Sequence, residues 1–181
     1  PIYTPDATEL AAGTVTLTLT TTGNGTCAGA SDDITINFTP APTVSTGSDV
    51  TVCENNALVA LNASVTIATG GTWSGGLGTF APNATDLNAV YTPDPTELAA
   101  GTVTLTLLST GNGSCLPEFD EVIINFTPAP TTNAGLDQTV CANNADVNLN
   151  GGITIATGGT WSGGAGFFAP DANALNAVYT P

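Results

Sequence analysis

The sequence predicts an all-β chain built of tandem β-sandwich domains. The first observation behind this prediction is an 88-residue repeat, because residues 3–90 and 91–178 are identical at 61 of 88 positions. A fixed period of that length indicates repeated copies of one small domain. The second observation is strict alternation along residues 14–20, where Val15, Leu17 and Leu19 alternate with threonines. This period is typical of a half-buried strand, and about seven such strands per repeat fit a two-sheet sandwich.

The remaining elements follow the same pattern in both repeats. The strand at 14–20 has its copy at 102–108. Further strands are predicted at residues 34–38, 59–61 and 65–67, with copies at 122–126, 147–149 and 153–155. Glycine- and asparagine-rich turns separate these runs. The only helix-like stretches are Thr8–Ala12 and Thr96–Ala100, single turns that end at Gly13 and Gly101.

Two proline-rich segments divide the chain. Residues 39–43 and 127–131 both read Thr-Pro-Ala-Pro-Thr, and two prolines in five residues favour an extended, semi-rigid connector. Cutting there predicts the C-terminal half of one domain (1–41), one complete domain (42–129) and the N-terminal half of the next (130–181). The chain begins and ends on the same Tyr-Thr-Pro phrase, so we expect a window of a longer array.

The composition excludes several classes of function. The 181 residues contain no Lys, Arg or His, and 15 carboxylates give a net charge of −15. The chain therefore lacks an imidazole base, a Schiff-base lysine and a guanidinium clamp. It also lacks the basic footprint of nucleic-acid binding and any apolar run long enough to enter a membrane. We expect no enzyme activity and no bound cofactor.

Carboxylate clusters leave one metal to consider. Asp32/Asp33 and Asp120/Glu121 could contribute to Ca²⁺ sites, which need six to eight hard oxygen ligands. No Asp-rich calcium-binding loop accompanies them. The clusters are interpreted instead as solubilising charge that keeps neighbouring domains apart.

Aromatic and aliphatic residues of the predicted strands are assigned to the core. The glycine-rich phrases around Trp73 and Trp161 could present a sugar-stacking platform, but a core tryptophan is the interpretation that sandwich folds favour. Gly75-Gly76-Leu77-Gly78 reads as a tight strand connection. The predicted structural core comprises Trp73, Trp161, Tyr91, Leu105 and Leu107.

Two cysteines per repeat, at Cys27, Cys53, Cys115 and Cys141, argue for disulfides in a chain without histidine. Three pairings stay open. Cys53–Cys115 would close a 62-residue loop within one domain, and Cys27–Cys53 with Cys115–Cys141 would join sequence neighbours. The third pairing, slightly favoured, is across domain junctions to cysteines outside this chain, because Cys53 and Cys115 fall at opposite ends of a sandwich and disulfides need close Cα atoms.

The chain as a whole resembles a known repeat family. The phrases Gly71-Thr72-Trp73-Ser74-Gly75-Gly76 and Gly111-Asn112-Gly113-Ser114-Cys115 carry the likeness, together with Tyr91-Thr92-Pro93. They resemble the PKD-like, immunoglobulin-like repeats of large secreted adhesins and gliding filaments that Bacteroidota-type bacteria export by the type IX system. The usual acidic phrase after the tryptophan is replaced by Ser-Gly-Gly, so ligand properties tied to it are not carried over.

The resemblance implies a sandwich domain used as a spacer. We therefore expect a structural stalk or fibre segment, secreted to a bacterial cell surface, whose partners are neighbouring repeats or other copies in a fibre. Two alternatives stay open: a multivalent carbohydrate- or protein-binding module, and a subunit that polymerises by exchanging half-domains.

Overall fold

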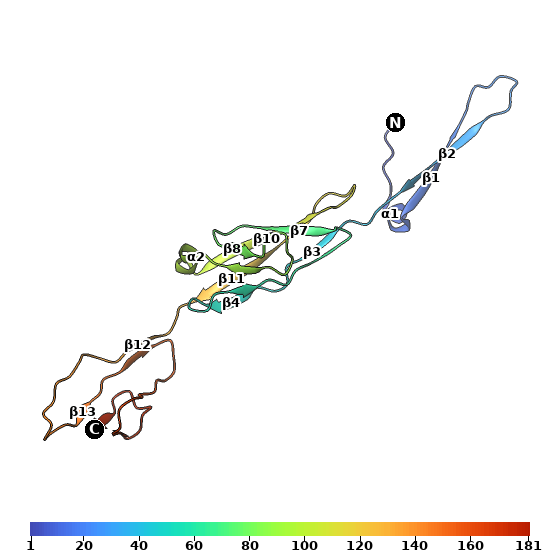
Figure 1. The fold of residues 1–181 in the computed structure, drawn as a ribbon. Helices are drawn as coiled ribbons and strands as arrows, with labels where there is room; N and C mark the ends of the chain where they lie inside the picture. Colours follow the sequence, from blue (N-terminus) through green and yellow to red (C-terminus); the bar gives the residue numbers. More distant parts are fainter. The chain divides into compact units, whose positions relative to one another are not determined.

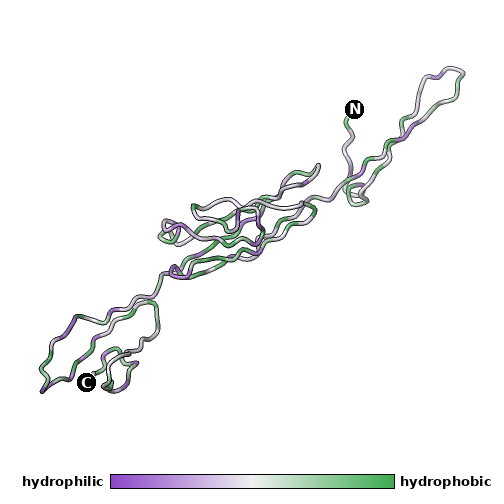
Figure 2. Tube along the Cα trace, in the orientation of Figure 1, coloured by the Kyte–Doolittle hydropathy of each residue, from purple (hydrophilic) through white to green (hydrophobic).

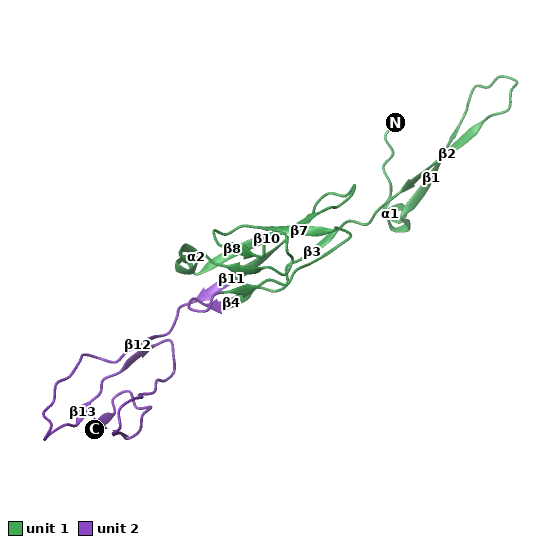
Figure 3. Ribbon diagram, viewed as in Figure 1, with its two compact units in different colours: residues 1–50, 58–124 green, residues 51–57, 125–181 purple.

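The computed structural model describes residues 1–181 and consists almost entirely of short antiparallel β-strands (Figure 1). By their contacts the residues form two compact units, one of residues 1–50 and 58–124 and the other of residues 51–57 and 125–181 (Figure 3). The predicted domain boundaries near residues 41 and 129 stay a prediction. We call residues 1–41, 42–129 and 130–181 the N-terminal segment, the middle repeat and the C-terminal segment.

The middle repeat contains a full set of strands and one short helix. These are β3 (Thr43–Ser45), β4 (Val50–Cys53), β5 (Val59–Ala60), β6 (Ser64–Thr66), β7 (Gly70–Ser74), β8 (Thr79–Ala81), β9 (Val90–Thr92), α2 (Pro95–Ala100), β10 (Thr102–Thr110) and β11 (Phe119–Thr127). One sheet has the order β4-β11-β10-β7, a second has the order β5-β9-β8, and β3 pairs with β6. The predicted all-β, immunoglobulin-like sandwich is confirmed.

The core lies between these sheets because strand alternation points every second side chain inward. β10 and β11 show this most clearly, since buried and exposed residues alternate along both. Figure 2 shows hydrophobic and hydrophilic residues interspersed along the whole chain. Between the sheets, the ring centroids of Trp73 on β7 and Phe80 on β8 lie 6.5 Å apart, and within the second sheet the rings of Phe80 and its strand partner Tyr91 on β9 lie 5.0 Å apart. The buried side chains include Val59, Leu61, Trp73, Tyr91, Val103, Leu105, Leu107, Val122, Ile124 and Phe126.

The N-terminal segment folds as a short helix followed by a hairpin. Helix α1 (Ala7–Ala12) begins with a capping box, in which the Asp6 carboxylate accepts from the Glu9 backbone N–H and the Glu9 carboxylate accepts from the Asp6 N–H. It ends at Gly13, whose φ of 73° is the left-handed conformation that glycine adopts without strain. β1 (Thr14–Thr20) then pairs along its whole length with β2 (Ser31–Asn37), as the sequence predicts.

The C-terminal segment contains five strands of two or three residues. They are β12 (Thr131–Asn133), β13 (Val147–Asn148), β14 (Gly152–Thr154), β15 (Phe167–Ala169) and β16 (Val178–Thr180). β12 pairs with β14, and β16 lies between β13 and β15. These pairings reproduce β3 with β6 and β5-β9-β8 of the middle repeat, as the shared sequence requires.

One local prediction is wrong in both repeats. Residues 65–67 read as one strand, but β6 ends at Thr66 and Ile67 has a φ of 65°. The Ala68 N–H donates to the Thr66 carbonyl oxygen at 2.7 Å, which closes a three-residue γ-turn around Ile67. Ile155 has a φ of 67° in the equivalent turn. A β-branched residue reads as strand in a sequence, so the turn has no sequence signal of the usual kind.

Candidate functional site: exposed half-domain faces and junction cysteines

The N-terminal segment exposes an apolar strand face that the middle repeat buries. Leu17 and Ile34 are direct partners across the hairpin and therefore project from the same face. Ile34 is 62% exposed and Leu19 is 78% exposed, whereas their counterparts Val122 and Leu107 are 1% and 0% exposed. This face of β1 and β2, which we call the hairpin face, has no opposing sheet in the N-terminal segment.

The C-terminal segment has a matching hollow. It is lined by Thr132, Gly151, Ile153, Gly159, Trp161 and Leu175. Trp161 is only partly covered there, although its counterpart Trp73 is 2% exposed. The indole N–H groups are satisfied alike, since Trp73 donates to the Asp86 carbonyl and Trp161 to the Ala174 carbonyl. The difference between the two tryptophans is therefore in apolar contact and not in hydrogen bonding.

Glycines show which side chain fills the equivalent space in the middle repeat. A Cβ added at Gly71 would lie 2.8 Å from Cδ1 of Leu107 and 3.2 Å from Cδ2 of Leu87. At the equivalent Gly159 an added Cβ would meet Leu175, the counterpart of Leu87, but no counterpart of Leu107. The counterpart of Leu107 elsewhere in the chain is Leu19, on the hairpin face. The hollow beside Trp161 thus lacks the leucine side chain that Leu107 supplies beside Gly71.

A buried polar network fastens the short helix to the sandwich. Tyr91 donates its hydroxyl to the Glu97 carboxylate at 2.8 Å, and the backbone N–H groups of Leu77 and Asp94 donate to Glu97 at 2.6 and 2.8 Å. Burial and the Glu97 hydrogen bond raise the pKa of Tyr91 to about 12. The Glu97 carboxylate thus accepts hydrogen bonds from three protein donors, as buried polar groups that hold a fold together do. We call these hydrogen bonds of Glu97 the lock.

The same network explains the glycine-rich connection between β7 and β8. A side chain at Gly76 would collide with the Tyr91 hydroxyl and the Glu97 carboxylate, and Gly78 donates its N–H to the Tyr91 oxygen at 3.0 Å. The tight connection predicted from the sequence is present, but its role in covering this network was not foreseen. The sequence did carry a signal for the Tyr91–Glu97 pair, because a tyrosine and a glutamate recur six residues apart at Tyr3 and Glu9. In the structure a hydrogen bond with Glu9 raises the pKa of Tyr3 to about 12.

Asp120 and Glu121, one of the two pairs considered for calcium, accept hydrogen bonds from protein groups. Asp120 accepts from both the backbone N–H and the hydroxyl of buried Thr46 at 2.9 Å, and these bonds lower the pKa of Asp120. No group of three or more His, Cys, Asp or Glu side chains comes together in residues 1–181. The calcium question stays open, and Asp120 serves to hold Thr46 to β11.

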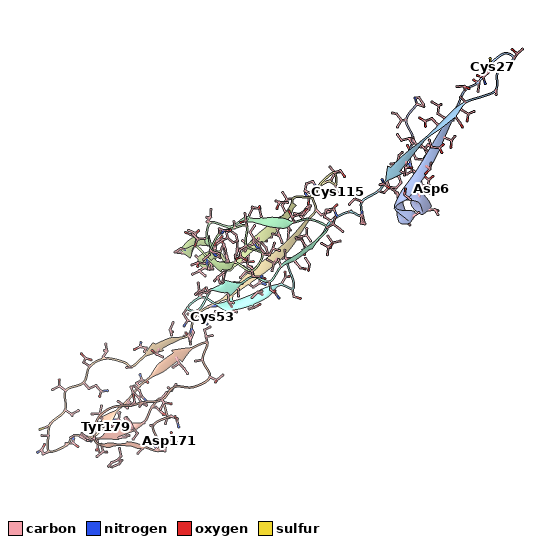
Figure 4. The ribbon with its side chains drawn as sticks, turned by 45° about the vertical axis from the view of Figure 1, so that its right-hand side comes forward. Asp6, Cys27, Cys53, Cys115, Asp171 and Tyr179 are labelled. Atoms are coloured by element: carbon pink, nitrogen blue, oxygen red, sulfur yellow. The ribbon has the colours of Figure 1, made fainter.

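Cys53 and Cys115 lie beside the proline-rich junctions. None of the four cysteines is disulfide-bonded in the structure, and the three pairings stay predictions. Figure 4 labels Cys27, Cys53 and Cys115. Cys115 Sγ lies 3.5 Å from the Pro40 carbonyl oxygen, at the junction that precedes the middle repeat. Cys53 Sγ lies 3.7 Å from the Pro128 carbonyl oxygen, at the junction that follows it. The two thiols therefore lie beside different junctions.

The predicted core residues fall into two groups. Trp73, Tyr91, Leu105 and Leu107 are buried in the middle repeat, whereas Trp161 is half-buried in the C-terminal segment. A buried Trp73 offers no sugar-stacking platform in the complete repeat. No helix of the chain combines the length and the apolar character that crossing a bilayer requires.

Comparisons with known proteins add only a distant likeness. No protein family and no curated protein matches the chain. Solved structures similar to it include extracellular cadherin domains 1–4 of protocadherin gamma B7, with 17% identity, 94% of this chain and 49% of that chain covered, and a TM-score of 0.40. Extracellular cadherin domains 3–6 of protocadherin gamma B2 match with 13% identity, 95% and 51% coverage and a TM-score of 0.42. The chain spans about half the length of these structures, and the sandwich assignment rests on the strand pairing described above.

Proposed function

We propose that the chain is a structural segment of a long extracellular fibre made of tandem β-sandwich domains, of the kind that bacterial surface adhesins and filaments use to project and space their active parts. One observation supports this most strongly: the flanking segments expose the faces that the middle repeat buries. Each segment therefore carries half of the same sandwich. The hairpin face and the hollow beside Trp161 correspond to the two halves of one domain, so a chain that carries both is suited to serial assembly.

The composition agrees with a mechanical role. The chain has no basic or imidazole side chain, and its one deeply buried carboxylate, Glu97, is occupied in the lock with Tyr91. Two cysteines per repeat suit an oxidising, extracellular compartment. Uniform negative charge keeps neighbouring domains apart and the array extended.

The test is single-molecule stretching of the chain fused in register to a second copy of itself. Residues 1–181 are followed by residues 6–181, which restores the Pro-Asp step found at Pro93-Asp94. Under reducing conditions we expect one abrupt step per complete sandwich, each releasing about 300 Å for 88 residues at 3.3–3.6 Å per residue. Smooth lengthening without steps would show that the repeats are not independent domains and would refute the proposal.

Half-domain exchange between separate copies is a second candidate, favoured by the same exposed hairpin face. The C-terminal segment of one copy would accept the N-terminal segment of another, in a head-to-tail contact that does not close. Electrophoresis of the native polypeptide under reducing, denaturing conditions separates the two candidates. A covalent array gives a species of hundreds of kilodaltons, whereas an exchanging subunit of this length gives a band near 17.9 kDa.

A further inference from the structure

The two cysteine positions approach equivalent junctions from opposite sides. Pro40 and Pro128 are the same position of the repeat, 88 residues apart. At the first junction the Pro40 carbonyl oxygen is contacted by Cys115, from the domain that follows it. At the second junction the Pro128 carbonyl oxygen is contacted by Cys53, from the domain that precedes it. A junction with a complete domain on each side would have both thiols beside one carbonyl oxygen.

Backbone contacts fix both thiols locally. Cys53 begins a tight turn in which the Asn56 N–H donates to its carbonyl oxygen at 2.9 Å, and the Glu54 N–H donates to the Thr127 carbonyl at 3.0 Å. Cys115 ends a turn in which its own N–H donates to the Asn112 carbonyl at 3.1 Å. Both turns recur in the other repeat, at Cys141 and Cys27. The thiol positions are therefore properties of the repeat and not of one copy.

We propose that the Cys53 position of each domain forms a disulfide with the Cys115 position of the next domain, so that every junction is covalently stapled. Two sulfurs at 3.5 and 3.7 Å from one oxygen are separated by no more than the sum of these distances, about 7 Å. Rotation about χ1 moves both sulfurs within this gap, and the proposal requires that the two Cα atoms lie about 4.4–6.8 Å apart, as in other disulfides. Within residues 1–181 no cysteine has its staple partner, since the partner of Cys53 would lie in the next repeat.

The chemistry is thiol–disulfide exchange with a disulfide oxidant of the extracytoplasmic space. One thiolate attacks the oxidant disulfide, forms a mixed disulfide and releases one oxidant thiolate. The second cysteine thiolate then attacks the protein sulfur of that mixed disulfide and displaces the other oxidant thiolate. The two protein thiols lose two protons and two electrons, and the oxidant disulfide is reduced to two thiols. Both cysteines are partly exposed in the structure, which gives the oxidant access.

In a stapled array, tension would pass through the disulfides and not through the sandwich domains. Cys27 and Cys53, like Cys115 and Cys141, are 26 residues apart, so the shortest path along a stapled array alternates one disulfide with 26 residues. Each disulfide together with one 26-residue segment carries the path past two whole repeats. Tension would then bypass the sandwich cores, so unfolding a domain would not lengthen the fibre. This consequence rests on the proposed mechanical function, whereas the pairing itself does not.

The pairing is tested on the same in-register fusion, oxidised in a glutathione buffer, digested with pepsin and mapped by mass spectrometry. We expect two disulfides, Cys53 to Cys27 of the second copy and Cys141 to Cys115 of the second copy, and four free thiols. The Cys53→Ser variant should lose the first disulfide and keep the second. Pairing of Cys53 with Cys115 of its own domain, random pairing, or free thiols throughout would overturn the proposal.

Stretching the oxidised fusion gives a second, independent reading. With both staples in place the fully unfolded length falls to about half of the reduced length, because the force passes through the disulfides and not through the enclosed chain. A reducing agent restores the full length. Regular steps in the reduced fusion with no shortening on oxidation would refute the staple and leave the proposed function standing.

Discussion

The repeat supplies a matched pair of substitutions that tests the packing directly. Leu107→Ala removes a side chain that has no exposed surface in the middle repeat and touches the space above Gly71. Glycine has no side chain that could move into the cavity, so we expect a loss near the upper part of the usual range for a buried leucine, about 4 kcal/mol. Leu19→Ala makes the same change at the equivalent position, where the leucine is 78% exposed. There we expect a change within about 0.5 kcal/mol.

The assay is urea unfolding followed by tryptophan fluorescence, with Trp161→Phe in every variant so that only Trp73 reports. At an m-value near 1.5 kcal/mol/M, a loss of about 4 kcal/mol lowers the midpoint by about 2–3 M. The protein is kept dilute so that exchange between copies does not bury Leu19, and light scattering checks that it is monomeric. Equal shifts for the two variants would refute the claim that the middle repeat alone has a completed core.

Three further predictions concern the lock, its titration and the γ-turn. Glu97→Gln should lower the free energy of unfolding by about 1–3 kcal/mol, because an amide group cannot accept from all the buried donors, while Glu118→Gln on an exposed side chain should change it little. The pKa of Tyr91 is about 12 in the folded chain and about 10 when unfolded, so its contribution is complete below pH 10 and is lost as the pH rises toward 12. Stability that stays level through this window in alkaline denaturant titrations would contradict the buried Tyr91 hydrogen bond. Ile67→Gly should not lower the melting temperature, because it relieves a positive φ at a half-exposed side chain, whereas Val65→Gly within β6 should lower it measurably.

The sequence predicted those features of the fold that depend on local pattern. Strict alternation located β1 and β10, and Gly13 marked the end of α1. Both are properties of a few consecutive residues, which is why a single sequence suffices. The γ-turn at Ile67 escaped prediction because a β-branched residue in such a turn contradicts its own propensity.

The candidate site depended on tertiary structure and was only partly predictable. A buried glutamate is rare unless its charge is paired or hydrogen-bonded, so the sequence alone does not predict that Glu97 is buried, although a glutamate recurs six residues after a tyrosine in both repeats. Its role becomes visible only when Tyr91 and the backbone N–H of Leu77 surround it. The placement of Cys53 and Cys115 at opposite ends of the domain did follow from sandwich topology. Their contacts with Pro128 and Pro40 required coordinates.

The most direct test joins the two flanking segments into one chain. Residues 130–181 followed by residues 6–41 contain one complete repeat of 88 positions and place Glu9 six residues after Tyr179, as Glu97 follows Tyr91. We predict a single cooperative thermal transition, with Trp161 emission shifted to the blue as for buried Trp73, and neither property in residues 130–181 alone. A joined chain that unfolds without cooperativity, with Trp161 still in water, would contradict the claim that the segments are halves of one sandwich.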